Sequence, residues 1–212
     1  AASILASGYH EVENFDIGPV LSLFGYNEAE GLRVRLGGRT YFSQNDQWRL
    51  EGFGAYGFKD DRFKFGVSAK VLLNRKNRLT LYAGYRKDVE QTGASLSSSN
   101  DILGRNLASS SLITVGANDK LTRVKLATMG VSLEPVKNLN IRLTGSYRSL
   151  RSATNTFSVD YLKEDGSIGS DVQQPEIRLL TYFTPNRKVS GYGVERTIIN
   201  KGSFPSFFLG GK

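Results

Sequence analysis

The feature of this sequence that most restricts its fold is an alternation of apolar and polar residues over long, turn-linked segments. In the clearest segment one face carries the apolar residues Phe63, Phe65, Val67, Ala69, Val71 and Leu73, and the other carries basic and small residues. Because successive side chains of a strand point to opposite faces, this period of two predicts a β-strand with one apolar face. A slip of one residue would exchange the faces, so the pairing register is strongly specified.

Neighbouring segments show the same alternation, and short polar turns at 43–46, 59–61 and 74–77 join four of them into consecutive hairpins. These predicted strands run about 11 or 12 residues, whereas strands of soluble domains usually run about 5 or 6. At about 3.3 Å per residue and a tilt near 45°, some 9 to 11 residues cross a bilayer core. The lengths therefore favour a membrane wall.

The second half of the chain repeats the pattern with two interruptions. Residues 88–120 are rich in Ser, Gly and Asn and predict a long loop, and a second long loop is expected at 149–175, with a short hairpin around 156–162. Between them, alternation returns at 123–128 and, after a turn near 135–138, at 139–147. The remaining segments 176–183, 191–200 and 204–209 resemble a wall that continues without closing.

We therefore expect an all-β fold, namely an antiparallel up-and-down transmembrane β-barrel wall, a partial barrel of long hairpin-linked strands. Residues 1–17 are expected to be an irregular lead-in, and 18–212 to form part of one outer-membrane β-barrel domain. The turns at 43–46, 74–77 and 136–138 would face the periplasm, because barrels of this kind have short periplasmic turns and longer external loops. No run of about 18 apolar residues predicts a transmembrane helix, and the first ten residues are too short and uncharged for a complete signal peptide.

The charges follow the same two faces. The chain has 28 Lys and Arg against 20 Asp and Glu, which alone would suggest a nucleic-acid partner. An Arg or Lys pointing into lipid at mid-depth costs about 2–4 kcal/mol, so the basic rows should face inward or lie at the rims. The candidate basic lumen face consists of Arg33, Arg35, Arg39, Arg49, Lys64, Lys70, Arg78, Arg86 and Arg142. Such a face could favour anionic solutes or pair with Glu51, Asp88 and a plug, although solvation of the inner wall is the simpler interpretation.

Aromatic residues gather toward the ends of the predicted strands. Amphipathic rings at these positions would lie at headgroup level, although ordinary sheet aromatics are the alternative. The candidate aromatic girdle consists of Tyr41, Trp48, Tyr56, Phe58, Phe63 and Tyr85.

The sequence offers little for catalysis or for metal and cofactor binding. It has no cysteine, and its single histidine, His10, has no His, Cys or carboxylate neighbours at ligand spacing. The glycine pattern Gly52–Gly57 matches a dinucleotide fingerprint but lies inside an alternating strand, where glycines make room for aromatic neighbours. The carboxylate pairs Asp60–Asp61 and Glu164–Asp165 lie among turn residues. We expect a non-enzymatic protein without catalytic, cofactor or metal sites, and calcium binding by external acidic loops is left open.

Two stretches and the tail resemble a known family. Residues 27–40, residues 50–66 and the tail 194–209, which includes Glu195–Asn200 and Phe204–Phe208, resemble a Bacteroidota outer-membrane family of unassigned function. Its members carry a carboxypeptidase-regulatory-like β-sandwich ahead of a membrane barrel. The resemblance implies that this chain is an internal barrel fragment, and the family has no catalytic residues to carry over.

The leading hypothesis is a non-enzymatic integral outer-membrane protein with a role in transport, envelope assembly or surface-loop display. Its expected location is the bacterial outer membrane. Its expected surroundings are outer-membrane lipid, with other envelope proteins in a larger complex as candidate partners and no nucleic acid. The alternative is a soluble all-β barrel that binds an anionic or apolar ligand. The two differ in where the apolar faces point, outward to lipid or inward to a core.

Overall fold

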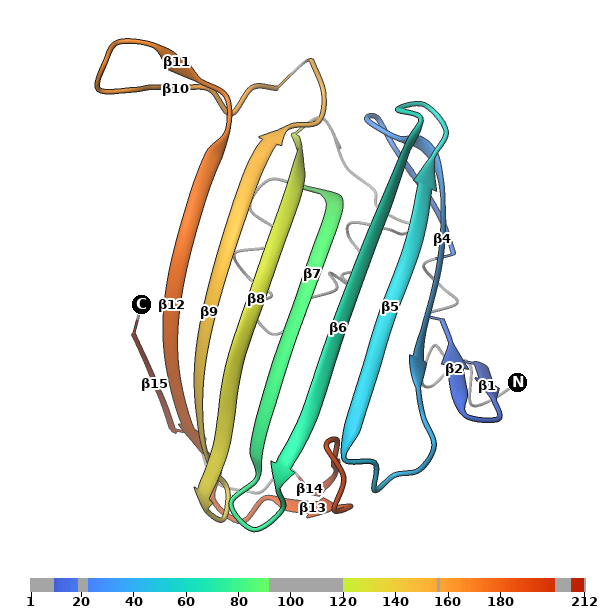
Figure 1. Ribbon diagram of the computed structural model, residues 1–212, viewed down its shortest axis with the longest axis vertical. Helices are drawn as coiled ribbons and strands as arrows, with labels where there is room; N and C mark the ends of the chain where they lie inside the picture. Colours follow the sequence, from blue (N-terminus) through green and yellow to red (C-terminus); the bar gives the residue numbers. More distant parts are fainter. Residues whose placement is uncertain (1–9, 19–22, 92–119, 156, 201–206, 212) are drawn as a thin grey trace.

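The computed structural model describes residues 10–18, 23–91, 120–155, 157–200 and 207–211. Regular structure in these residues is β-structure, and most of it belongs to one 11-stranded antiparallel sheet (Figure 1). Its strands are β1 (His10–Val12), β2 (Phe15–Ile17), β3 (Phe24–Asn27), β4 (Gly31–Thr40), β5 (Trp48–Gly57), β6 (Arg62–Asn74), β7 (Leu79–Gln91), β8 (Leu121–Val136), β9 (Leu139–Ser152), β12 (Val172–Phe183) and β15 (Phe207–Gly211). The all-β antiparallel prediction is confirmed. No helix among the described residues is long and apolar enough to cross a membrane.

The sheet has simple up-and-down order from β4 to β9, followed by β12 and β15. On its other side β4 pairs with both β2 and β3, and β1 pairs with β2. The edge strands β1 and β15 do not pair with each other, so the described sheet is open. Figure 1 shows that the sheet is strongly curved, with one convex and one concave face.

Connections between strands lie at two opposite ends of the sheet. We call one the turn end, which carries residues 41–47, 75–78 and 137–138, and the other the loop end, which carries 58–61 and 153–171 (Figure 1). The strands between them are long, with 13 residues in β6 and in β7, 16 in β8 and 14 in β9. The separation of the two sets of connections agrees with the prediction, and the assignment of the turn end to the periplasm stays a prediction.

The two faces of the sheet have opposite compositions. On the convex face large apolar side chains are exposed, for example Leu36 at 61%, Phe63 at 59% and Met129 at 67% of their full accessible area. The whole predicted row from Phe63 to Leu73 is exposed on this face. On the concave face charged side chains are buried, among them Arg33 at 1% exposure and Glu30 at 0%. The predicted alternation of β6 is therefore observed, with apolar residues outward and polar residues inward.

The glycine-rich stretch of β5 lies within a strand, as the sequence indicates. A Cβ atom on Gly54 would come within 3.0 Å of the Phe63 ring on the neighbouring strand. The glycine thus makes room for an aromatic side chain, which confirms the structural interpretation of this pattern.

Several predicted boundaries are wrong because short or irregular strands leave little periodic signal. The lead-in 1–17, expected to be irregular, contains β1 and β2, whose runs of three residues are too short to show alternation. β7 extends through Asp88 to Gln91, where it pairs with 121–124, and the rest of the predicted loop, 92–119, lies outside the described residues.

The second predicted loop is also shorter than expected. β9 continues to Ser152 and β12 begins at Val172, so Pro175 lies inside a strand. A small hairpin does form in this connection, but later than predicted, from β10 (Tyr161–Leu162) and β11 (Ile168–Gly169). Residues 172–174 pair with the end of β9, so both strands are longer than the alternating pattern in the sequence predicts.

Of the two segments near the C-terminus that were predicted to continue the wall, one joins the sheet and the other does not. β15 pairs with β12 and continues the sheet. Residues 191–200 do not, because β14 (Thr197–Asn200) pairs with β13 (Lys188–Ser190) in a separate hairpin that lies across the turn end in Figure 1.

Candidate functional site on the concave face

A buried network of charged side chains occupies the loop end of the concave face. Arg33 on β4 donates to Asp88 on β7 at 2.7 Å and to Glu30 at 3.1 Å. Lys64 on β6 contacts Glu30 and Asp60, each at 2.7 Å. β4 and β7 are separated by two strands in the sheet, so their side chains meet only because curvature brings them together over the concave face.

The network depends on the position of Glu30, which lies in the turn before β4. The side-chain oxygen of Asn27 accepts hydrogen bonds from the backbone N–H groups of Ala29 and Glu30, and its amide nitrogen donates to the Glu30 carboxylate. This local turn directs the carboxylate inward. Gly57 leaves space for it, because a Cβ there would lie 2.8 Å from Glu30 Cβ and 2.7 Å from Lys64 Nζ.

A further buried pair on β7 continues the network, with Arg86 donating to Glu90 at 2.6 Å. The cations Arg33, Lys64 and Arg86 thus face the carboxylates of Glu30, Asp60, Asp88 and Glu90. Charge is nearly balanced here. This end of the face therefore works as an internal brace between strands.

The turn end of the concave face carries a cavity of about 200 Å³ with a different charge balance. Five basic residues line it against two acidic ones, and these are Lys70, Arg78, Arg142, Arg178, Arg196, Glu134 and Glu195. Lys70 pairs with Glu195 at 2.8 Å, and Arg196 pairs with Glu134. Hydroxyl and amide groups also line the cavity, and they belong to Tyr82, Thr80, Thr128, Ser132, Asn140 and Thr144. The cavity is polar and has an excess of positive charge, which suits an anion.

The segment that includes β13 and β14 closes one side of this cavity. Its backbone is fixed to the 41–47 turn, because Val194 N–H donates to the Asp46 carbonyl at 2.6 Å and Tyr192 N–H donates to Asn45 at 2.8 Å. Arg78 reaches the same segment from the 75–78 turn and donates to the carbonyls of Gly193 at 2.7 Å and Val194 at 3.2 Å. No local pattern in the sequence indicates this arrangement.

Arg78 adopts an unusual backbone conformation to make these contacts. Its φ is +55°, a left-handed value that costs a residue with a long side chain energy and that glycine adopts freely. Partial burial and then the nearby charge of Arg196 lower the pKa of Arg78 below its usual range. From this position the Arg78 guanidinium links the 75–78 turn to the 191–196 segment.

We predict that Arg78→Gly releases this segment without unfolding the sheet. Glycine suits the backbone conformation, whereas loss of two hydrogen bonds from a charged donor should raise chymotryptic cleavage after the exposed Tyr192 by about tenfold or more. Lys76→Ala, in the same turn, serves as the matched control. Equal cleavage rates for the two variants would contradict the role assigned to Arg78.

Comparison with known proteins places the chain in a family. A family model described as "Family of unknown function (DUF5686) C-terminal domain" matches residues 6–210. The chain belongs to this family. No curated protein and no solved structure matches it. The Bacteroidota origin, the outer-membrane location and the carboxypeptidase-regulatory-like domain suggested by the resemblance stay predictions for this DUF5686 domain.

In the DUF5686 domain all nine candidate lumen residues lie on the concave side, in three groups. Arg33, Lys64 and Arg86 belong to the loop-end network, and Lys70, Arg78 and Arg142 line the turn-end cavity. Between them Arg39 pairs with Asp16 at 2.8 Å, the Arg35 guanidinium lies 3.8 Å from the centre of the Phe53 ring, and that of Arg49 lies 5.1 Å from the centre of the Tyr41 ring. Their function as a lumen stays a prediction.

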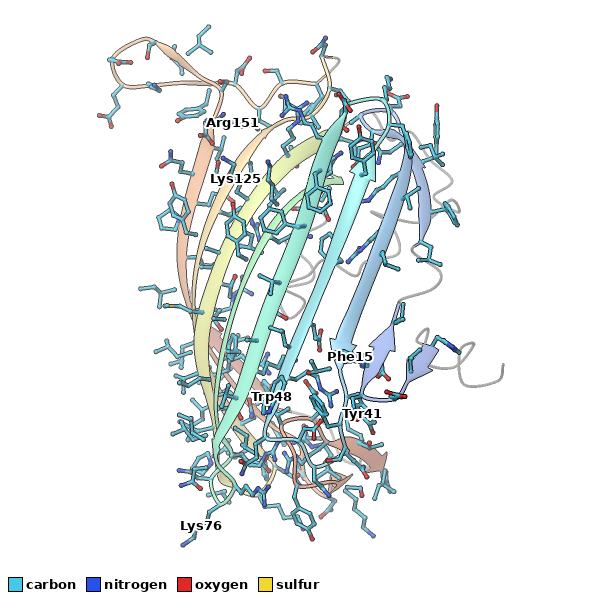
Figure 2. All side chains as sticks on the ribbon, turned by 45° about the vertical axis from the view of Figure 1, so that its right-hand side comes forward. Phe15, Tyr41, Trp48, Lys76, Lys125 and Arg151 are labelled. Carbon is cyan, nitrogen blue, oxygen red and sulfur yellow. The ribbon has the colours of Figure 1, made fainter. Side chains whose placement is uncertain are left out.

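Four of the six candidate girdle residues of the DUF5686 domain lie on the convex side near strand ends, and their position at a membrane interface stays a prediction. Trp48 lies on the convex face near the turn end, and Tyr56, Phe58 and Phe63 lie near the loop end. Tyr85 lies at the middle of β7, because this strand continues to Gln91 and is longer than the sequence pattern indicates. Figure 2 shows Tyr41 and Trp48 near the turn end. Tyr41 lies on the concave side under Arg49, and the Phe42 ring packs near Trp48 with ring centres 5.5 Å apart. Period two should have indicated this, because Tyr41 follows the inward-facing Arg39 by two residues.

His10 of the DUF5686 domain is exposed in β1, opposite Ile17. In the described ranges no three His, Cys, Asp or Glu side chains are grouped closely enough to hold a metal ion.

Proposed function

We propose that this domain forms part of the membrane-spanning wall of a non-enzymatic outer-membrane β-barrel, with its concave face toward a water-filled lumen that favours anionic solutes. One observation carries the proposal, namely the inverted distribution of side chains between the two faces. A soluble sheet of this size would cover its apolar face, yet here that face is exposed while arginines are buried on the other.

The dimensions of the apolar face fit a bilayer. On β5 the aromatic residues Trp48 and Tyr56 are separated by eight residues, or roughly 26 Å along the strand at about 3.3 Å per residue. A strand tilt of about 40° reduces this to about 20 Å along the membrane normal, close to the apolar band of about 25 Å in such barrels. Aromatic residues thus lie at both ends of the apolar band on β5, which supports a position of these rings at the two membrane–water interfaces.

The polar face fits a lumen. The loop-end network braces neighbouring strands with nearly balanced charge, whereas the turn-end cavity has five basic and two acidic residues. Rings of basic side chains are the usual source of preference for anions in a pore. This asymmetry supports passage or retention of anionic solutes.

Spin labels on neighbouring positions test the proposal, because the chain has no native cysteine. Leu143→Cys lies on the convex face of β9, and Ser132→Cys lines the concave cavity on β8 at a similar level. In liposomes the label at 143 should collide mainly with oxygen, which partitions into lipid, and the label at 132 mainly with a water-soluble nickel chelate. If the full chain stays soluble without detergent and both labels meet the chelate, the domain is a soluble β-protein and the proposal is wrong.

A further inference from the structure

Four cationic side chains gather on the convex side of the loop end, outside the site described above. They are Lys87 on β7, Arg123 and Lys125 on β8, and Arg151 on β9. The pairing register places Lys87 directly opposite Lys125, and Arg123 directly opposite Arg151. Like charges directly opposite each other destabilise a sheet, since their Cβ atoms are only about 4.5–5.5 Å apart. Figure 2 shows Lys125 and Arg151 together near the loop end.

This cationic cluster is only partly neutralised by the described residues. Arg151 pairs with Asp171 at 2.8 Å, and hydrogen bonds from Arg151 and then Ser149 hold the pKa of Asp171 below its usual range. No carboxylate in the described ranges lies within ion-pairing distance of Lys87, Arg123 or Lys125, and the Nε atom of Arg123 is buried without a hydrogen-bond partner there. A crevice of about 200 Å³ adjoins the cluster where β6 and β7 cease to pair beyond Phe65 and Lys87.

An apolar groove of about 560 Å³ lies next to the cluster on the same strands. The groove begins two residues from Lys87 and Lys125 in the direction of the turn end. Its first cross-strand row contains Tyr85 and Ala127, and the next row contains Met129 and Gly145. Small side chains make the floor of the groove, while tyrosines stand at its edge next to the cations. A phosphate ion would contact the cluster alone, whereas a lipid would use both features.

We infer that the cationic cluster and the groove together bind one phosphate-bearing membrane lipid. The phosphate lies among Lys87, Arg123, Lys125 and Arg151, and an acyl chain occupies the groove. This inference rests on the proposed function, because it requires the convex face to lie in a bilayer. Attraction between basic side chains and anionic headgroups, added to burial of apolar surface, provides the preference for an anionic lipid.

The test measures association of spin-labelled phosphatidylglycerol and phosphatidylcholine with the full chain in phosphatidylcholine vesicles. Phosphatidylglycerol should associate about tenfold more strongly, and Lys87→Gln with Lys125→Gln should remove most of that preference. Lys76→Gln with Lys188→Gln, which removes the same charge from exposed positions at the turn end, should leave it unchanged. Gly145→Phe should fill the groove and weaken lipid association, and it should fold because a Cβ at Gly145 meets no atom within 4 Å.

Three results would overturn the inference. The first is equal association of the two lipids, and the second is an equal loss from both lysine pairs, which would indicate general surface charge. The third is full displacement of phosphatidylglycerol by millimolar inorganic phosphate with no effect of Gly145→Phe, which would indicate a site for free anions.

A chain that inserts with the face orientation shown by the labels at 132 and 143 but lacks lipid preference would contradict this inference and leave the proposed function unaffected. A chain that fails to insert would overturn both.

Discussion

Replacing Arg33 by methionine should lower the free energy of unfolding by about 3–5 kcal/mol. Arg33 is 1% exposed and is the cation that joins Asp88 on β7 to Glu30 beside β4. Without it, the buried carboxylates of Glu30 and Asp60 retain Lys64 as an ion-pair partner, whereas Asp88 loses the ion pair that it makes in this network. Removal of one member of a buried ion pair leaves uncompensated charge, which is the costly case. Urea unfolding of the full chain in detergent micelles measures the change.

Arg151→Met provides a matched control for this prediction. Arg151 also pairs with an aspartate at almost the same distance, 2.8 Å against 2.7 Å, but it is 61% exposed. Exposed pairs contribute about 0–1 kcal/mol, so this variant should change stability by no more than that. Equal losses in the two variants would show that burial of the network is not what makes Arg33 important.

A second substitution separates charge imbalance from loss of packing. Asp88→Leu, added to Arg33→Met, removes the carboxylate left without its partner, so the double variant should recover part of the lost stability. A double variant as unstable as the sum of the two single variants would mean that the ion pair itself carries no coupling.

The faces of most long strands could be predicted because the alternation is a local property of the sequence. β8 is the exception, since its apolar Val124 and Leu126 are buried on the concave face while Arg123 and Lys125 lie on the convex face. In β6 every second residue from Phe63 to Leu73 is apolar, and a slip of one residue in the pairing would place Lys64 on the apolar face. The nine basic residues on the concave side follow from the same period of two. Tyr41 lies on the concave side because it follows Arg39 by two residues, although its place at a strand end is typical of a girdle residue.

The arrangement of charges on the concave face could not be predicted from local pattern. Arg33 and Asp88 are 55 positions apart, and their contact depends on how strongly the sheet curves between β4 and β7. The cavity at the turn end depends likewise on a segment that leaves the wall, 191–196, whose contacts with Arg78 and Asp46 cross more than a hundred residues. Periodicity records which face a residue occupies and contains no information on distances across a curved sheet.

Substitution of Met129 by arginine discriminates most sharply between a membrane wall and a soluble sheet. Met129 lies near the middle of β8 on the convex face and is 67% exposed. In a soluble protein a charge at so exposed a position would change stability by about 0.5 kcal/mol or less. In a bilayer the same side chain lies near mid-depth, where an arginine costs about 2–4 kcal/mol. We expect the larger loss, measured by urea unfolding of the full chain from liposomes.

Leu162→Arg is the control for this substitution, because Leu162 is 75% exposed on the β10–β11 hairpin beyond the loop end. This hairpin should lie in water, so the variant should unfold at the same urea concentration as the unmodified chain. The difference between Met129→Arg and Leu162→Arg should disappear in aqueous buffer if the chain dissolves there without detergent. A Met129→Arg variant that inserts and unfolds like the unmodified chain would show that the convex face does not meet hydrocarbon.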